Sequence, residues 1–468
     1  MKTQRIQHGV RSLREHGARN AAFYLFCAFI ISYFGRLAKR VPLLGAMHFD
    51  LVLAVLALLA IVFAPPKTRA PRARNEMDPV AKRLCILLAY IVVTIPFVEW
   101  PGSVLHNFES YLKSVCFFFF VVATVDTTRK LKTLLTVYTA TQVWRVIEPL
   151  LMHVKSGYWG DYTSLGNWEY MDRLSGSPYD IINPNGLGFV VIMTLPMLQF
   201  LVKPDTPIRR MIWAALAGAM CYALVLSASR SGFLALVFLC LFVAWRSKHR
   251  VAWLAMGILG ATLALALMTN LQRERYVSIF SHNAPGGATA ELRVTGVLGD
   301  LRVSLRRPLF GHGIGTSREA NAHFRDADMP SHDLYTETAE ELGYVGLILV
   351  LALIWSFLRA CWTAQRVASA APTTDEHLRF LNVVARSLVA VVAVDLFFSF
   401  AAFGLDEPYW YFIGGLSVAT ARLAAKLSPA TAGLVPGKRA ARAIWRLPTG
   451  RSMRATRRAA ARGDLGAR

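Results

Sequence analysis

The sequence is poor in charged residues. Only 17% of its 468 residues are Asp, Glu, Lys or Arg, whereas a soluble domain carries about 25%. Hydrophobic residues make up 54% of the chain, and the mean hydropathy is +0.39. Apolar runs of roughly 15–22 residues, close to the length that crosses a bilayer, recur along the whole sequence. This composition excludes a string of soluble domains and predicts a polytopic membrane protein.

Acidic residues are especially scarce. The chain has 29 of them against 52 Lys and Arg, which leaves a net charge of +23. In a soluble protein such an excess would indicate nucleic-acid binding. Here the basic residues crowd into short connections between apolar runs, as they do in the cytoplasmic loops of membrane proteins. We therefore expect membrane lipid around the chain and no nucleic-acid partner.

Cysteines are few and none lies in a long loop. All six fall in or beside apolar runs, so the sequence contains neither a disulfide framework nor a metal-type cysteine spacing. A small-residue cleavage site after the first apolar run is also missing, so we expect a retained first helix. An internal repeat is not detectable. These absences favour a non-repetitive helical membrane domain without a cysteine-based metal site.

Twelve apolar segments predict an all-α fold with about 12 transmembrane helices. They lie near residues 21–35, 43–64, 84–98, 111–125, 131–152, 185–202, 211–228, 232–245, 251–269, 343–358, 381–403 and 409–425. We therefore assign residues 1–425 to one transmembrane domain. The basic segment 426–468, rich in Arg, Ala and Gly, is expected to be a disordered cytoplasmic tail.

The basic residues also predict the orientation in the membrane. They concentrate in the even-numbered loops, which places those loops and both termini in the cytoplasm of a bacterial cell. Arg36, Lys39 and Arg40 in the first loop conflict with this rule but are outnumbered. The odd-numbered loops, including the long loops 153–184 and 270–342, would then face the periplasm. Long loops on a rigid scaffold are where function concentrates.

The loop 270–342 is predicted to contain an amphipathic helix over residues 291–307. Its apolar residues share one face, so the helix could lie on the membrane surface; they are Val294, Val297, Leu298, Leu301 and Leu305. Arg293 and Arg302 are nine residues apart, about half a turn around the helix axis. A regular helix therefore lets one of these two arginines, but not both, bind a given phosphate group.

Three alternate glycines follow this helix, at Gly311, Gly313 and Gly315. Glycine permits left-handed backbone and close approach of another group. The spacing matches neither nucleotide-binding fingerprint. A plain tight turn and an anion-binding loop both remain open at this point.

Two further positions are candidates for chemistry. His332 lies just ahead of the tenth apolar segment, and a histidine can accept a proton near neutral pH. Arg230 lies in the very short connection between two apolar segments, 211–228 and 232–245. A charge so close to the apolar zone indicates function, and the guanidinium fork suits a diphosphate. A structural histidine and an arginine that reaches to the interface are the competing interpretations.

Acidic residues at three further places are candidates for structural or functional roles. Arg145 and Glu148 are three residues apart in a predicted helix and could form an ion pair or a pocket wall. Asp395 lies unexplained within an apolar segment. Asp326 and Asp328 have the spacing of a metal-binding pair, which is a common arrangement in loops, and we expect no metal there.

Taken in order, these motifs resemble the bacterial O-antigen ligase and polymerase superfamily. The resemblance spans roughly residues 180–350 in motifs and the whole chain in topology. It rests on the Ser-x-Ser-Arg-x-Gly junction at Arg230, on Arg293 fifteen residues before the Pro-Leu-Phe-Gly-x-Gly-x-Gly turn, and on the series His332, Tyr335, Glu341, Gly343 and Gly346. Position 333 is Asp where this family usually has Asn, and an acidic neighbour would raise the pKa of His332.

The resemblance implies a membrane glycosyltransferase of the bacterial inner membrane with a periplasmic active site. The donor would be a glycan on undecaprenyl diphosphate, and the favoured acceptor would be the lipid A core oligosaccharide. Transfer would invert the anomeric centre without a metal or other cofactor. Arg230 and Arg293, with Arg302 as second choice, would bind the diphosphate, and His332 would deprotonate the acceptor. Tyr335, Glu341 and Arg145 would shape the pocket.

Other activities remain open on sequence grounds. A polymerase that joins lipid-linked repeat units is the main alternative, and a relative that glycosylates proteins would share the same motifs. A transporter or flippase would need polar residues near the bilayer midplane and paired half-helices. The sequence has few such residues and no repeat, which disfavours transport.

Overall fold

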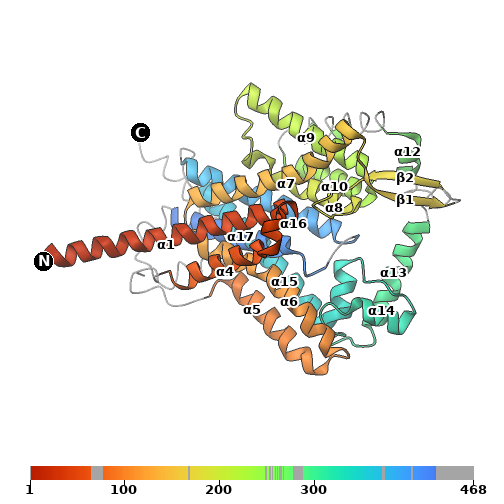
Figure 1. Cartoon of the computed structure of the whole chain (residues 1–468), viewed down its shortest axis with the longest axis horizontal. Helices are drawn as coiled ribbons and strands as arrows, with labels where there is room; N and C mark the ends of the chain where they lie inside the picture. Colours follow the sequence, from red (N-terminus) through yellow and green to blue (C-terminus); the bar gives the residue numbers. More distant parts are fainter. Residues whose placement is uncertain are drawn as a thin grey trace, which may run out of the picture.

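The computed structural model describes residues 2–64, 77–166, 169–247, 268–277, 288–370, 375–401 and 404–427, together with scattered positions between 250 and 266. The described part is mostly helical (Figure 1). The long helices of the first half are α1 (Lys2–Gly35), α4 (Phe49–Val62), α5 (Pro79–Thr94), α6 (Pro101–Thr124) and α7 (Thr128–Ser156). Those of the second half are α8 (Pro184–Thr194), α9 (Pro207–Ser227), α10 (Arg230–Arg246), α15 (Leu334–Ala370), α16 (Glu376–Phe398) and α17 (Pro408–Leu427).

Four described helices are long and apolar enough to cross a membrane. They cover Pro79–Phe97, Pro207–Ser227, Leu334–Ala370 and Glu376–Phe398, and two shorter apolar helices cover Phe49–Val62 and Pro184–Phe200. Each of these six matches an apolar segment predicted from the sequence. The predicted number of twelve spans stays a prediction. The predicted span 251–269 and the predicted tail 426–468 fall largely outside the described residues.

The prediction of a purely α-helical fold is wrong in the loop 153–184. Strands β1 (Gly160–Gly166) and β2 (Glu169–Leu174) pair there as an antiparallel hairpin. Burial alternates along β2 as in a strand with one covered face, because Met171 and Arg173 are buried whereas Tyr170 and Asp172 are exposed. The hairpin reaches out beside α12 (Asn270–Val277), as Figure 1 shows.

The described part of the loop 270–342 contains three helices, where the sequence predicted one. Besides α12 these are α13 (Ala288–Ser304) and α14 (Ser317–Arg325). Helix α13 is the predicted amphipathic helix, shifted by three residues. Its apolar residues Val294, Leu298 and Leu301 are exposed within the described part of the chain, as expected of a helix that lies on a membrane surface.

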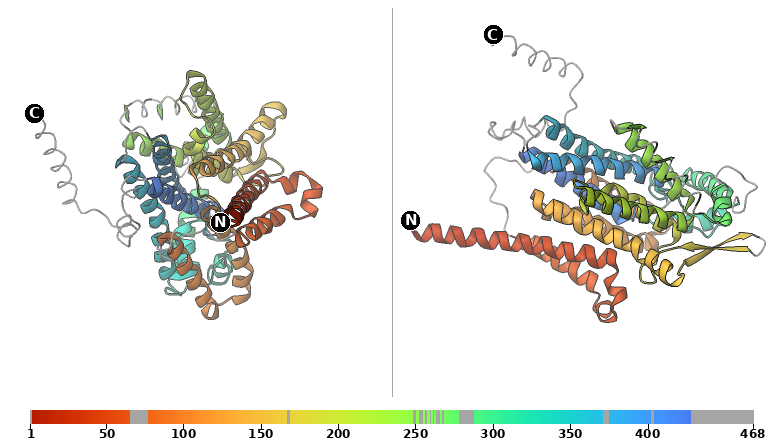
Figure 2. Two further views of the ribbon diagram at one scale, coloured as in Figure 1. Left: turned by 90° about the vertical axis from the view of Figure 1, so that its left-hand side faces the viewer. Right: turned by 90° about the horizontal axis from the view of Figure 1, so that it is seen from above.

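Contacts between connections divide the molecule into two ends. At one end the even-numbered loops meet, since Lys426 Nζ donates to Asp126 O, Thr128 Oγ1 contacts His377 Nδ1, and Arg246 Nη2 donates to Gln365. At the other end the odd-numbered loops meet; the hydrogen-bonded pairs there include Arg36–Asp180, Ser103–Glu319, Asn107–Gly315 and Leu334–Ser399. Figure 2 shows the long helices running between these ends. This separation agrees with the predicted alternation of loops.

Helix α17 forms the centre of the bundle. Its residues from Pro408 to Ala421 are all buried, and it packs against α6, α15 and α16. Phe412 meets Tyr138 of α7 with ring centroids 4.6 Å apart. The last described helix therefore contacts elements from both halves of the chain, and it appears amid the other helices in Figure 1.

Candidate functional site

Arg230 is the first residue of α10, at a sharp hinge after α9. Ala228 adopts a left-handed conformation (φ 46°) and is fully buried. Ser229 then caps the new helix, with its Oγ accepting a hydrogen bond from Gly232 N at 3.2 Å. The first amides of a helix carry partial positive charge. The hinge therefore presents Arg230 together with the positive end of α10.

Two more arginines are directed at the same hinge. Arg173 of β2 donates from Nε to Ser227 O at 2.9 Å and from Nη2 to Asn185 Oδ1 at 3.0 Å. Arg275 of α12 donates from Nε to Ala228 O at 3.1 Å. Their exposed fractions are only 6% and 7%. These donors satisfy carbonyls that the left-handed turn takes out of the helix ladder.

Like charges crowd at this hinge. Burial, and then the charge of Arg275, lower the pKa of Arg173, with Arg230 acting in the same direction and Asp161 against it. A guanidinium remains charged at neutral pH, so the repulsion persists. Arg173, Arg230 and Arg275 thus place three guanidinium groups around one hinge, an arrangement that suits a multiply charged anion.

The sequence prediction missed Arg173 and Arg275. They lie in the two long odd-numbered loops. Isolated arginines among aromatic and acidic residues do not indicate a binding site in the sequence. Only the pairing of β1 with β2 and the packing of α12 bring them to Ser227 and Ala228. The local sequence around Arg173 therefore gave no signal for this role.

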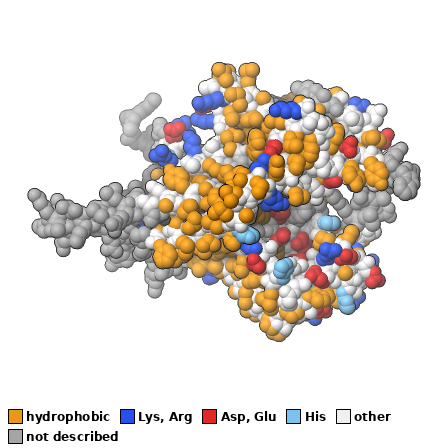
Figure 3. All heavy atoms as spheres, viewed as in Figure 1, with side chains coloured by type: hydrophobic (Ala, Val, Ile, Leu, Met, Phe, Trp, Pro, Cys, Tyr) orange, Lys and Arg blue, Asp and Glu red, His pale blue; other side chains and the backbone are white. Residues whose placement is uncertain are grey.

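His332 lines a cavity of about 280 Å³ at the same end of the molecule. The cavity lies between α13, α14 and the chain that precedes α15. Its lining residues are Gly296, Val297, Asp300, Asn321, Arg325, Ala327, Met329, Pro330, His332 and Phe400. His332 is exposed, so a ligand in this cavity would reach the imidazole. Figure 3 shows histidine and acidic side chains gathered towards this end of the face it presents.

Tyr335 and Asp333 position the chain around His332. The Tyr335 hydroxyl donates to Leu396 O at 2.7 Å, and its ring packs against Phe400 with centroids 4.6 Å apart. Asp333 Oδ1 accepts from Tyr335 N at 2.7 Å and from Thr336 N at 3.2 Å. The unusual Asp at 333 therefore acts as a helix cap for α15, and Tyr335 contacts the cavity wall through Phe400.

Glu341 and the glycine turn form one structural unit. Gly311, Gly313 and Gly315 all have positive φ, at 70°, 119° and 74°. The Glu341 carboxylate accepts from Gly315 N at 2.8 Å and from Ser317 N at 3.3 Å. His312 N and Gly313 N donate to the carbonyls of Glu340 and Glu341. The backbone N–H groups of the turn thus donate to protein acceptors and are not free to bind an anion. The three glycines therefore form a tight turn rather than an anion-binding loop.

A break in α15 explains why those carbonyls are available. Gly343 has φ 67° and interrupts the helix. Its freed acceptors are satisfied by the glycine turn and by Tyr90, whose hydroxyl donates to Leu342 O at 2.8 Å. A Cβ on Gly311 would lie 2.4 Å from the carbonyl carbon of Glu341, and a Cβ on Gly343 would lie 2.4 Å from Leu309 O. Each glycine therefore permits the other segment to approach.

A second histidine, His312, is fixed inside this turn. Its Nδ1 lies 2.9 Å from Glu99 Oε2 and its Nε2 lies 3.3 Å from Val303 O, and the ring is fully buried. Burial raises the pKa of Glu99, but the hydrogen bond and charge of His312, joined by Arg307, outweigh burial and lower it. This buried arrangement is structural, in contrast to the exposed His332.

The predicted pairing of Arg145 with Glu148 is wrong. Arg145 instead forms a two-pronged ion pair with Asp180, including Nη2 to Oδ1 at 3.1 Å, and donates to the Tyr409 hydroxyl at 2.6 Å. Glu148 pairs with Arg40, and Arg36 pairs with Asp180. These contacts also explain the basic residues in the first loop, because their carboxylate partners lie at the same end.

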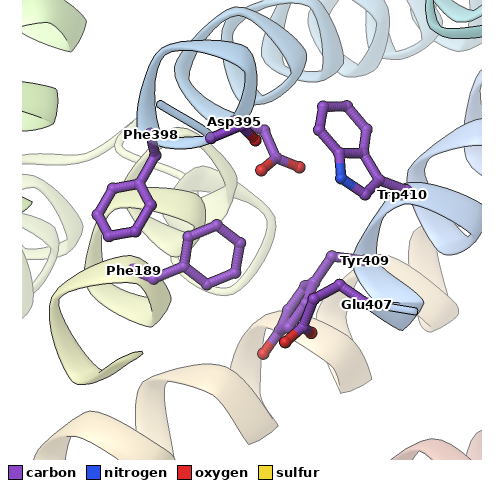
Figure 4. Close-up of a pocket in the computed structure, with 7 residues that line it drawn as sticks. Phe189, Asp395, Phe398, Glu407, Tyr409 and Trp410 are labelled. Atoms are coloured by element: carbon purple, nitrogen blue, oxygen red, sulfur yellow. The ribbon is translucent and has the colours of Figure 1, made fainter. Parts of the chain in front are cut away.

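Asp395 and Glu407 face a cavity of only about 10 Å³ beside Tyr409. Figure 4 shows Asp395 and Trp410 directed at this space from one side and Glu407 and Tyr409 from the other. The volume is close to that of a single water molecule. Burial, and then Asp406, raise the pKa of Glu407 to about 7 despite the opposing charge of Arg145. The space is too small for a glycan.

Three predicted residues lie elsewhere or outside the described side chains. Arg302 is exposed on α13, and the side chain of Arg293 lies outside the described residues. Asp328 pairs with Arg318, with Nε 2.7 Å from Oδ1, on the exposed surface. Among the described residues no group of three His, Cys, Asp or Glu could hold a metal ion.

The odd-loop end therefore carries two sets of residues. One is the arginine cluster at the hinge, and the other is the His332 cavity with Tyr335 and Phe400 in its wall. Within the described part of the chain, neither Arg230 nor Arg302 lines that cavity. A substrate that uses both sets must extend from one to the other, as a lipid diphosphate with an attached sugar does.

Comparison with known proteins addresses the segment that carries most of these residues. Residues 215–351 match the O-antigen ligase family. No curated protein matches the chain. The matching segment begins within α9, passes the hinge and the glycine turn, and ends within α15, after the Gly343 break. The resemblance seen in the sequence is confirmed for residues 215–351, the segment that matches the O-antigen ligase family.

Proposed function

We propose that this protein is a membrane glycosyltransferase of the O-antigen ligase type. It moves a glycan from undecaprenyl diphosphate to an acceptor hydroxyl, with the lipid A core oligosaccharide as the favoured acceptor. The reaction takes place on the periplasmic side of the bacterial inner membrane, and both termini are cytoplasmic. The observation that carries the proposal is the occurrence of an arginine cluster and an accessible histidine at one end of the molecule, with Arg230, Arg275 and His332 inside the segment that matches the family.

The arginine cluster supports binding of the donor diphosphate. When the bond between the sugar and the diphosphate breaks, the departing oxygen takes the electron pair and its negative charge grows. Arg230, Arg173 and Arg275 surround the hinge with positive charge that is already in place. Preorganised charge of this kind lowers the barrier more than charge that must rearrange. The guanidiniums supply the role that a divalent cation plays in metal-dependent transferases.

His332 supports activation of the acceptor. An acceptor hydroxyl is a weak nucleophile until its proton is removed, and the imidazole takes that proton as the oxygen attacks the anomeric carbon. The new bond forms on the face opposite the diphosphate, which inverts the configuration. The proton leaves on His332, and undecaprenyl diphosphate leaves with the electron pair. The accessible position of His332 in its cavity agrees with this role.

The proposal is tested with purified protein, a defined undecaprenyl-diphosphate glycan and purified lipid A core. We expect His332→Ala to lower the transfer rate by about 10²- to 10⁴-fold, the usual contribution of a general base, while donor binding stays unchanged. His106→Ala is the matched control, because His106 is exposed on α6 outside the cavity. Full-rate transfer by His332→Ala would refute the assignment.

Three further measurements separate the alternatives. Elongation of the lipid-linked glycan without any transfer to lipid A core would identify a polymerase instead. Activity that a chelator abolishes and magnesium or manganese restores would contradict the metal-independent mechanism. Movement of intact donor across a vesicle membrane without glycosyl transfer would identify a flippase.

A further inference from the structure

The cavity beside His332 contains more recognition chemistry than proton transfer requires. One wall carries Asp300, Asn321 and Arg325, three polar side chains from α13 and α14. Asp300 and Asn321 are 4% and 1% exposed, so they are built into the fold rather than lying on its surface. We propose that this cavity is the subsite for one uncharged sugar ring of the acceptor. The proposal rests on the glycosyl transfer proposed above.

The polar wall is held in a fixed geometry. Asn321 Nδ2 donates to Asp300 Oδ1 at 3.1 Å, and Arg325 Nη1 donates to Asp300 Oδ1 at 2.5 Å and to Asn321 Oδ1 at 3.1 Å. The guanidinium lies against bare helix backbone, because a Cβ at Gly299 would fall 2.2 Å from its Cζ atom. Both helices therefore contribute to one rigid polar surface.

Part of that surface is still available to a ligand. Within the described part of the chain, Asp300 Oδ2 and the Nε and Nη2 atoms of Arg325 make no hydrogen bond to protein. The wall thus offers an acceptor next to two donors. Neighbouring hydroxyls on a sugar ring each donate and accept, so they match this arrangement. Phe400 on the cavity rim offers an apolar surface to the carbon-bound hydrogens of the ring.

The size and charge of the cavity further restrict the class of ligand that it can bind. Its volume of about 280 Å³ lies just under the range of roughly 300–1,000 Å³ that holds drug-sized ligands. It therefore suits a single ring rather than an oligosaccharide. Arg325 is already paired with Asp300, so the wall is close to neutral. A neutral wall disfavours a phosphorylated sugar and favours an uncharged one.

The position of His332 assigns the sugar to the acceptor. The base must contact the hydroxyl that it deprotonates, and the acceptor brings that hydroxyl. The arginine cluster that would hold the donor diphosphate does not contribute to the lining among the described residues. The ring in the cavity is therefore the one whose hydroxyl is glycosylated.

Gly296 makes a direct test possible. It lines the cavity, and a Cβ there would meet nothing within 4 Å, so Gly296→Leu fills the cavity without forcing the helix apart. With full-length protein we expect Gly296→Leu to raise the KM for lipid A core by about tenfold or more, equivalent to about 1.4 kcal/mol, with the donor KM unchanged. Gly299→Ala, which displaces Arg325 from the wall, should act in the same direction.

Controls keep the two proposals apart. Gly218→Leu is matched to Gly296→Leu, since Gly218 also has open space around it but lies on α9 outside the cavity. Direct calorimetric binding of core oligosaccharide freed from lipid A, and of the free glycan repeat unit, is measured without any donor. Loss of this binding in Gly296→Leu supports the subsite even where transfer fails. An effect on donor KM alone, equal binding by both variants, or no binding of either sugar by the wild-type protein overturns it.

Discussion

At the scale of single residues, Arg173 and Arg275 contribute more than positive charge. They donate hydrogen bonds to the carbonyl oxygens of Ser227 and Ala228. These bonds fix the backbone from which Arg230 projects. Two like-charged groups are tolerated so close together because each is bound to carbonyl oxygen, which offsets part of the cost of burial. An arriving diphosphate would relieve the remaining repulsion.

Charge and hydrogen bonding at Arg173 can be separated by substitution. Arg173→Gln keeps donors but removes the charge, and Arg173→Lys keeps the charge. Geranylgeranyl diphosphate, a shorter isoprenoid diphosphate, serves as the probe for diphosphate binding. We expect Arg173→Gln to weaken its binding by about tenfold, or about 1.4 kcal/mol, and to reduce the salt dependence of that binding. Lys should recover part of the affinity.

The matched control for this series is Arg210→Gln, because Arg210 is exposed near the start of α9 at the opposite end of the molecule. Diphosphate binding that Arg173→Gln leaves intact would show that Arg173 only supports the fold. Equal loss in Gln and Lys would lead to the same conclusion.

The sequence identifies polar residues in or beside apolar segments as candidates for function, but it does not identify their interaction partners. Arg230 and His332 stand out because of their sequence surroundings. Arg145 was also predicted, but its partner Asp180 is 35 positions away, and local spacing favoured Glu148 instead. Helical neighbours can be read from sequence, whereas contacts across loops depend on how helices pack.

At the scale of elements, the glycine turn and the break in α15 depend on each other. The turn supplies amides to carbonyls that the break at Gly343 releases. The glycine spacing predicted a tight turn as one of two options. The break was not predictable, because a lone glycine in an apolar helix is usually accommodated without one.

A substitution at Gly311 should expose this dependence. Gly311→Ala combines a left-handed φ of 70° with a Cβ only 2.4 Å from backbone of Glu341, and such strain costs roughly 1–3 kcal/mol. We expect a lower melting temperature in detergent and reduced transfer activity. Both should be visible in a thermal shift assay and a rate measurement.

Gly102→Ala provides the comparison. Gly102 lies near the start of α6 and has nothing within 4 Å of its Cβ position, so alanine should be neutral or stabilise the helix slightly. If Gly311→Ala were as stable as Gly102→Ala, the close approach of the turn to α15 would not contribute to stability.

At the scale of the whole molecule, the arrangement of loops agrees with an alternating path through a membrane. Apolar runs predicted the main helices because length and hydropathy are local properties. The hairpin β1–β2 was missed because its strands are short and lie among the aromatic residues of a loop. Charge predicted which loops share an end of the bundle, but not which residues meet there.

Thiol labelling of intact cells tests the orientation. Lys155→Cys places a thiol at the exposed end of α7 in an odd loop, and Lys203→Cys places one in an even loop. With a permeabilised outer membrane, a membrane-impermeant maleimide should label position 155 in whole cells and position 203 only after lysis. The parent chain, with its six cysteines, gives the background. The reverse pattern would place His332 on the cytoplasmic side and refute the proposed periplasmic reaction.

The central position of α17 has a consequence for biogenesis. Arg145 emerges early from the ribosome, yet its phenolic partner Tyr409 belongs to the last described helix. The buried ion network cannot close, and the middle of the bundle cannot fill, until that helix has been inserted. The native packing around Arg145 is therefore expected to be completed only once α17 is in place.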